Sequence, residues 1–320
     1  MAGILVIAEV TEGEIAPISF ELIGAAKQLS AQGGGDVTAF VAGNEAQAQA
    51  LIAGGADKAF AATNPNLQSG LADAYLPAVN AAIQQSGANI VLIGQTSLGR
   101  DLGPALAFAN KTAVAMDSVE LKMDGGRLHA TRSAYGGNAR AEVTWKNDLQ
   151  VATVKAKSFD APEGVSGSGS VTTISEGGES KVKVLGVEKA ETTGIRLEDA
   201  GIVVSGGRGL GDPSAFGMLE QLAGTMKQAA VGASRAACDL GWYPPASQVG
   251  LTGKTVSPNL YIAVAISGAS QHMAGMAGSK NIVAINKDAD ANMVKVSKFA
   301  VIDDYKKVIP ALIEEIKKLG

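Results

Sequence analysis

Three glycine-containing segments follow one another in the last third of the chain. They are residues 232–237 (GASRAA), 248–254 (QVGLTGK) and 267–272 (SGASQH). In each segment, glycines let backbone N–H groups approach a ligand closely, and one side chain adds a guanidinium, a hydroxyl or an imidazole donor. Together the segments predict a cradle for a polar cofactor.

A fourth glycine-rich loop lies upstream, where a predicted strand over 202–205 runs into residues 206–211 (GGRGLG) and then into a helix. A strand, a glycine loop and a helix N-terminus in this order form a common phosphate site. The spacing is not G-x-G-x-x-G, and no acidic residue ends a strand about 20 residues later, so the dinucleotide fingerprint is absent. Arg208 can pair with a diphosphate through two hydrogen bonds, which favours a ligand site over a simple turn.

Each of these features also has a plain structural explanation. Arg235 can pair with Asp239 one helical turn later. Ser267 and Gly268 are placed to cap the helix that follows a very apolar strand. A lone histidine such as His272 is usually a structural group. Only the presence of the other glycine loops nearby in the sequence favours a ligand role for these residues.

The chain lacks the residues of a hydrolase or of a metal site. It contains no G-x-S-x-G, H-E-x-x-H or G-x-x-x-x-G-K-[ST] motif, and only two histidines and one cysteine. A nucleophile with its base and orienting acid is therefore hard to assemble. Donors without a proton shuttle suit a protein that holds and tunes a redox cofactor.

Composition limits the partners and the compartment. Hydrophobic residues make up 46% of the 320 residues, charged residues make up 18%, and the net charge is −4. This charge argues against a nucleic acid or an acidic membrane as partner, because either needs a concentrated basic surface. The longest apolar region, 260–276, is interrupted by polar residues, so no membrane insertion is expected. A single cysteine and the lack of a signal-peptide pattern predict a cytoplasmic location.

The first 190 residues are expected to form one α/β domain. Strand-like runs alternate with helical segments up to residue 115, which predicts a mostly parallel sheet with helices on both faces. Turn sequences then predict an antiparallel hairpin region, and the Pro-, Gly- and Ser-rich residues 160–180 predict a flexible connection before a strand-like 181–187. The expected strands are 4–10, 37–41, 58–62, 90–94, 118–123, 128–133, 139–145 and 150–155, with hairpin turns at 124–126, 136–138 and 146–148.

A second α/β domain is expected over residues 191–320, where strands and helices alternate again. The chain is too long for one ordinary core, which supports a boundary near residue 190. This second domain carries all of the glycine loops described above. Its expected elements are strands 201–205, 260–266, 281–286 and 294–302, a helix over 214–227 and a terminal helix after Pro310.

The glycine loops resemble those of one known family, the electron transfer flavoprotein alpha subunit. The similar segments are 206–209, 231–237, 248–254, 267–276 and 285–288. The resemblance implies that the C-terminal domain binds one FAD, while the N-terminal domain contacts a partner subunit. The implied FAD contacts are Arg208, Ser234, Arg235, Val249, Gly250, Leu251, Thr252, Ser267, Gly268, Ala269, Ser270, Gln271, His272, Asn286, Asp304 and Tyr305.

The resemblance also implies a role. In that family a beta subunit, often holding AMP or a second flavin, completes a heterodimer that carries electrons and has no stand-alone catalysis. The heterodimer shuttles electrons from flavin dehydrogenases, such as the acyl-CoA dehydrogenases of fatty acid beta-oxidation, to a quinone oxidoreductase. Thr252 is implied to hydrogen-bond flavin N5, and His272 and Arg235 to favour negative charge on the reduced ring.

Alternatives and departures accompany this resemblance. The chain can instead be a subunit of an electron-bifurcating complex, an NAD-dependent enzyme with a related nucleotide-binding domain, or a redox-silent nucleotide-binding scaffold. Leu251 stands where the family usually has Gln, and Ser270 stands where Ile is common. Residues 299–305 (FAVIDDY) replace a Tyr-Gly-Ile-Val-x-Asp-Leu/Ile pattern. These departures affect the expected tuning of the flavin more than its binding.

Overall fold

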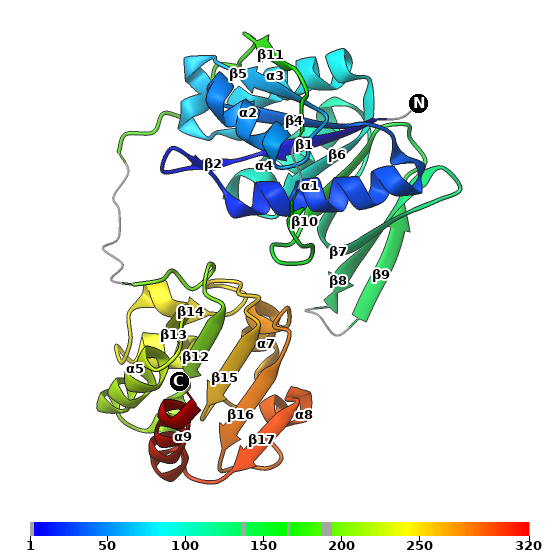
Figure 1. Cartoon of the computed structure of the whole chain (residues 1–320). Coiled ribbons are helices and arrows are strands. Elements are labelled where there is room, and N and C mark those ends of the chain that lie inside the picture. The colour runs from blue at the N-terminus through cyan, green and yellow to red at the C-terminus, as the bar shows by residue number, and fades with distance from the viewer. Residues whose placement is uncertain (1–2, 136–138, 165–166, 187–193, 320) are drawn as a thin grey trace. The chain divides into compact units, whose positions relative to one another are not determined.

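The computed structural model describes residues 3–135, 139–164, 167–186 and 194–319. It divides into two compact units, residues 1–187 and 188–320, each with its own sheet (Figure 1). The α/β class predicted for both parts of the chain is confirmed.

Unit 1 is built on a nine-stranded sheet in the order β11-β5-β4-β1-β6-β10-β7-β8-β9. All neighbours from β11 to β7 pair in parallel, while β7, β8 and β9 pair antiparallel. The strands are β1 (Gly3–Ala8), β4 (Val37–Ala42), β5 (Lys58–Ala62), β6 (Ala88–Gly94), β7 (Val114–Asp124), β8 (Arg127–Ala134), β9 (Ala139–Thr144), β10 (Gln150–Val154) and β11 (Val171–Ile174), beside a small hairpin of β2 (Val10–Thr11) and β3 (Glu14–Ile15).

Helices cover both faces of the parallel part of this sheet. Along β1, Ile4 and Val6 face one hydrophobic core, while Leu5 and Ile7 face the other. The first core includes residues of α1 (Pro17–Leu29) and α2 (Glu45–Ala53), and the second includes residues of α3 (Ala72–Ser86) and α4 (Ser97–Ala109). Burial on both faces explains why the central strands are continuous apolar runs. The short helical turns are η1 (Ser30–Gly34) and η2 (Pro65–Ser69).

One expected hairpin is wrong. The turn over 146–148 does not return β10 to β9; it carries β10 into the middle of the sheet, where it pairs in parallel with β6 and β7. Every residue of β10 is buried, as a central strand requires, whereas β9 is the exposed edge. The turn at 124–126 is a hairpin turn as predicted, and the turn at 136–138 lies outside the described residues.

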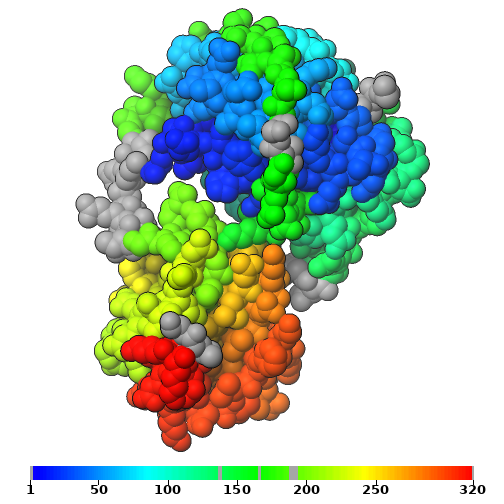
Figure 2. Space-filling model, viewed as in Figure 1, coloured from blue at the N-terminus to red at the C-terminus, as the bar shows by residue number. Residues whose placement is uncertain are grey.

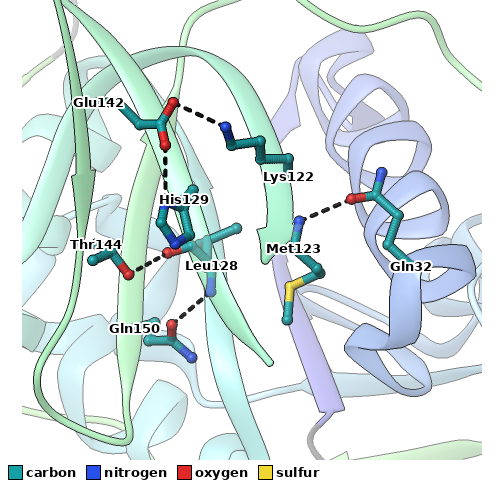
Figure 3. A network of polar contacts seen from close by, with 8 residues as sticks. All are labelled: Gln32, Lys122, Met123, Leu128, His129, Glu142, Thr144 and Gln150. Atoms are coloured by element: carbon teal, nitrogen blue, oxygen red, sulfur yellow. Dashed lines mark hydrogen bonds and ion pairs between the residues drawn. The ribbon is translucent and has the colours of Figure 1, made fainter. Parts of the chain in front are cut away.

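Strands β7, β8 and β9 form an antiparallel arm of the sheet, and a network of polar contacts holds this arm in place (Figure 3). The carboxylate of Glu142 accepts from Lys122 Nζ at 3.0 Å and contacts His129 Nδ1 at 2.9 Å, joining all three strands of the arm. On the sheet side, the buried Gln150 Oε1 accepts the backbone N–H of Leu128 at 2.8 Å. The Gln150 side chain thus joins β10 to β8, two strands that are not neighbours in the sheet. This contact helps to fix the register of β8.

The glycine-rich residues 160–180 are not the flexible connection that their composition predicts. Their described part lies along the surface of unit 1 against the blue N-terminal segments (Figure 2), and it adds β11 to the sheet edge beside β5. Glycine serves close approach here, because a Cβ on Gly169 would lie 2.1 Å from the carbonyl oxygen of Asp57. The described residues 181–186 form no strand, which corrects the strand expected at 181–187.

Unit 2 is a six-stranded, fully parallel sheet in the order β14-β13-β12-β15-β16-β17. One face packs against α5 and α9, and the other against α7 and α8. The strands are β12 (Ile202–Gly206), β13 (Ala229–Ser234), β14 (Gln248–Val249), β15 (Leu260–Val264), β16 (Ile282–Asn286) and β17 (Phe299–Ile302). The helices are η4 (Arg208–Leu210), η5 (Pro213–Ala215), α5 (Phe216–Gly224), α6 (Arg235–Asp239), η6 (Pro245–Ser247), α7 (Ser270–Met276), α8 (Asn292–Val296) and α9 (Tyr305–Leu319).

Three expected elements of unit 2 differ from the structure. The predicted strand 294–302 is α8 followed by β17, and the predicted helix 214–227 is the turn η5 followed by a shorter α5. The terminal helix begins at Tyr305 and contains Pro310, instead of starting after it. Asp304 explains the early start, because its side chain accepts the backbone N–H of Lys306 at 3.0 Å as a helix cap does.

We expect Gly169→Ala to lower the free energy of unfolding by about 1 to 3 kcal/mol, because the new methyl group overlaps a backbone carbonyl of unit 1. Gly186→Ala is the matched control: nothing lies within 4 Å of its Cβ position, so its effect should stay within about 0.5 kcal/mol. Urea unfolding followed by circular dichroism measures both values. Equal losses in the two variants would show that residues 167–174 are not packed as described.

Candidate functional site

A cleft of about 740 Å³ lies at the carboxyl ends of the strands of unit 2. Its lining comes from the segments that follow β12, β13, β14, β15 and β16 in turn. Ligands of open parallel sheets bind at this edge, because all carboxyl ends meet there. The volume falls within the range of small-molecule and cofactor pockets. The glycine loops predicted from the sequence therefore converge on one site.

Most of the predicted site residues line this cleft, and three do not. Gly268, Ser270 and Asp304 are outside the lining. The residues that line the cleft as expected are Arg208, Ser234, Arg235, Val249, Gly250, Leu251, Thr252, Ser267, Ala269, Gln271, His272, Asn286 and Tyr305.

Gly268 lets the loop after β15 pack closely against α8. It has φ of +81°, and a Cβ on it would lie 2.3 Å from the backbone nitrogen of Met293 in α8. Only glycine fits a left-handed conformation with such a close neighbour. The loop after β15 is thereby pressed onto α8, and the carbonyl of Ser267 accepts the N–H of Met293 at 3.2 Å.

The expected cap of α7 is wrong. The N-cap residue is Ala269, not Ser267 or Gly268, and within the described part of unit 2 no side chain caps this helix. The reason is the contact with α8, which holds Ser267 and Gly268 in the loop before the helix. The first turn of α7 is closed by the backbone instead, because the carbonyl of Ala269 accepts the N–H groups of His272 at 2.9 Å and Met273 at 3.0 Å.

The two arginines of the cleft present their charge to solvent. Arg208 is exposed in the turn η4. Arg235 Nε lies 3.4 Å from Asp239 Oδ2, the pair that the sequence also allowed, and its side chain is 68% exposed. An exposed pair of this kind contributes little stability, so the guanidinium can turn to an anion in the cleft.

Thr252 is oriented by a neighbour that the sequence prediction missed. Gln248 Nε2 donates to Thr252 Oγ1 at 3.0 Å, so the hydroxyl accepts on that side and keeps its own hydrogen for a ligand. Backbone bonds close the turn, since Gly250 N donates to Lys254 O at 3.1 Å and Lys254 N donates to Gln248 O at 2.7 Å. Gln248 opens the QVGLTGK segment, but nothing in its spacing indicated that it would reach Thr252.

His272 lies on α7 and is only 7% exposed. Its Nε2 lies 2.9 Å from the hydroxyl of Tyr261, a fully buried residue of β15. Burial lowers the pKa of His272 to about 4, and the backbone of Val249 offsets only part of this effect. The imidazole of the free chain is therefore neutral at pH 7.

Two further predicted residues have their polar groups engaged within unit 2. Asn286 donates to the carbonyl of Ile266 at 3.0 Å and accepts the N–H of Asp288. The Tyr305 hydroxyl donates to the carbonyl of Leu210 at 2.7 Å. These contacts hold the loops after β12, β15 and β16 in place at the cleft.

Asp304 is a structural residue and not a lining residue. Its carboxylate accepts the backbone N–H of Lys306 and pairs with Lys287 Nζ at 3.0 Å, and these contacts lower its pKa. Lys287 itself lines the cleft, as do Asp288 and Asp303, which the prediction did not include. Asp303 belongs to the segment 299–305, which departs from the family pattern, whereas Lys287 and Asp288 belong to the segment 285–288, which resembles it.

Other kinds of site are not evident in the described residues. Among them, no group of three or more His, Cys, Asp or Glu side chains gathers in a way that holds a metal ion. Burial raises the pKa of the Cys238 thiol, and Asp239 adds to this effect, which disfavours the reactive thiolate. No helix in the described ranges is long and apolar enough to cross a membrane.

Comparison with known families gives two matches that cover most of the chain. Residues 4–183 match the electron transfer flavoprotein domain, and residues 196–277 match the electron transfer flavoprotein FAD-binding domain. The second match contains the loops after β12, β13, β14 and β15 that line the cleft.

Full-length relatives agree with these matches. The chain is 38% identical to an electron transfer flavoprotein subunit alpha of Bacillus subtilis, over 99% of this chain and 98% of the relative. It is 41% identical to that of Megasphaera elsdenii (99% and 96%) and 40% identical to that of Mycobacterium tuberculosis (99% and 99%). The chain therefore belongs to the electron transfer flavoprotein alpha subunit family, whose members bind FAD and carry electrons without a catalytic reaction of their own.

Proposed function

We propose that the chain pairs with an electron transfer flavoprotein beta subunit and shuttles electrons from flavin dehydrogenases, such as acyl-CoA dehydrogenases, to a quinone oxidoreductase in the cytoplasm. The observation that carries the proposal is the cleft of unit 2, which brings arginine, threonine and histidine donors together at the carboxyl ends of the strands. We further propose that residues 191–320 bind FAD and that residues 1–190 supply contacts to the beta subunit.

The residues present fit FAD. Arg208 lines the cleft and suits a diphosphate, because a guanidinium can pair with phosphate oxygens through two hydrogen bonds. When bound, FAD supplies a ring that accepts and releases electrons, and the protein's task is to orient and tune it. Thr252 keeps a hydroxyl hydrogen for an acceptor such as flavin N5.

Arg235 and His272 tune the site in different ways. Arg235 brings a positive charge that favours negative charge on a reduced ring by direct electrostatics. His272 is neutral in the free chain, so it favours the same state only through an N–H dipole in a water-excluded position.

Purification of the chain with its beta subunit tests the cofactor and the partner together. We expect a yellow heterodimer with a flavin absorption spectrum and one FAD per alpha chain. A second flavin on the beta subunit would favour the bifurcating type of complex over simple transfer. A colourless heterodimer that cannot be reconstituted with FAD would overturn the proposal.

Arg235→Ala should lower the reduction potential of the bound flavin by some tens of millivolts. For one electron, about 59 mV corresponds to a tenfold change in the equilibrium constant of reduction. The reason is the loss of a cation at the cleft. Arg140→Ala is the matched control, because Arg140 also forms an exposed ion pair, with Glu120 at 2.7 Å in unit 1. Redox titration with a spectroscopic readout measures both; identical curves for Arg235→Ala and the parent would refute the role of Arg235.

The buried His272 should make the folded chain sensitive to acid. Its folded pKa of about 4 lies below the ordinary value of 6.5, so between these values only the unfolded chain takes up the proton. Stability is therefore complete above about pH 6.5 and falls toward pH 4, by up to about 3 kcal/mol. His272→Gln should show a shallower fall in this range, measured by urea unfolding at several pH values. The same slope in both proteins would contradict a buried neutral imidazole.

A further inference from the structure

Residues 207–211, the Arg208 turn, follow β12 and include η4, and the side chain of Tyr305 holds this turn from the core side. Tyr305 is the first residue of α9, and its hydroxyl donates to the carbonyl of Leu210 at 2.7 Å. Leu210 and Tyr305 belong to the same hydrophobic core and are only 3% and 4% exposed. This buried hydrogen bond therefore ties the turn to a helix that lies far away in the sequence.

The carbonyl of Leu210 depends on this bond because the turn itself offers it no donor. Within the turn, Leu210 N donates to Gly207 O and Gly211 N donates to Arg208 O, both at 3.1 Å. The last carbonyls of a helical turn have no donor inside that turn. The Tyr305 hydroxyl supplies the donor, and without it a buried carbonyl would lack a partner at a cost in free energy.

The opposite side of the Arg208 turn rests on the end of β15. Gly207 N donates to Val264 O at 2.9 Å, and a Cβ on Gly209 would lie 2.8 Å from the carbonyl oxygen of Ala265. The turn is thus held by β15 on one side and by Tyr305 on the other. Arg208 is exposed and lines the cleft, so these contacts determine where its backbone stands at the cleft.

The hydroxyl of Tyr305 is not free to donate to a ligand. The family resemblance implies a direct FAD contact at Tyr305, and the residue does line the cleft. A phenol has one hydrogen to donate, however, and Leu210 already accepts it. The geometry therefore gives this hydroxyl an indirect role.

We propose that Tyr305 is a positioning residue whose hydroxyl fixes the Arg208 turn, so that the guanidinium of Arg208 is preorganised for the diphosphate of FAD. Preorganisation of this kind reduces the ordering cost of binding. The role toward FAD rests on the proposed function, whereas the hold on the turn is a property of the chain alone. Tyr305 acts on the cofactor through Arg208.

Amide hydrogen exchange of the full chain without cofactor, followed by NMR, measures the hold on the turn. Tyr305→Phe removes only the hydroxyl. We expect the amides of Leu210 and Gly211 to exchange about tenfold faster in this variant, because the turn opens more easily when a buried carbonyl is unpaired. Exchange at the parent rate would overturn the proposal.

Tyr243→Phe is the matched control for a general loosening of unit 2. The Tyr243 hydroxyl donates to Glu220 at 3.2 Å, away from the cleft lining. We expect Leu210 and Gly211 to exchange at the parent rate in this control. An equal acceleration in the two variants would show that loss of either hydroxyl loosens the whole unit, and would overturn the specific role of Tyr305.

A double-mutant cycle in the heterodimer tests whether Tyr305 acts through Arg208. The four proteins are the parent, Tyr305→Phe, Arg208→Ala and the double variant, and quenching of flavin fluorescence gives the Kd for FAD. We expect Tyr305→Phe to weaken FAD binding several-fold when Arg208 is present and to add almost nothing in the Arg208→Ala background. Additive losses would overturn the positioning role, because they indicate a direct contact or a general effect.

The two measurements separate this proposal from the proposed function. Faster exchange of the turn with an unchanged Kd in Tyr305→Phe would overturn the role toward the cofactor while FAD binding stands. A heterodimer that binds no FAD even in the parent form would overturn the proposed function, and the exchange result for the turn would remain valid.

Discussion

The site depends on one close contact between backbones, where α7 rests on the turn after β14. A Cβ on Gly275 would lie 2.4 Å from the Cα of Gly250, so neither helix nor turn could stand this close with any side chain between them. Around this contact, Leu251 N donates to Gln271 O at 2.8 Å and Val256 N donates to Gly275 O at 2.7 Å. Thr252 and His272 come from separate segments, and this contact sets them at one cleft.

Close approach, more than flexibility, explains several glycines of the chain. Gly207 and Gly268 in unit 2 pack against neighbouring backbone, as Gly169 does in unit 1. When only composition is considered, a glycine-rich stretch such as residues 160–180 is interpreted as a flexible linker. Composition cannot tell a glycine that frees the chain from one that lets two segments touch, because the second segment is distant in sequence.

This difference marks what could be predicted from the sequence. Strands such as 58–62, and the convergence of the glycine loops, follow from local patterns and from the rule that parallel strands share a carboxyl edge. The place of β10 in the sheet depends on which strand it pairs with, and no local signal gives that. Likewise, the contacts of Gln248 with Thr252 and of Tyr261 with His272 form only after folding. Asp304 looked like a contact residue because its cap of α9 was not apparent from the sequence.

Arg235 and His272, the two residues proposed to favour negative charge on a bound ring, differ in their surroundings: Arg235 is exposed and His272 is buried. A permanent cation buried like His272 would carry a large desolvation cost, so Arg235 keeps its guanidinium in solvent. Solvent and salt then screen its effect over about 8 to 10 Å at ordinary ionic strength. The imidazole of His272 avoids that cost by staying neutral, and as a buried dipole it acts at short range where salt does not reach. In the proposed function, the exposed charge of Arg235 therefore acts over a longer but screened range, while the buried imidazole of His272 acts at short range.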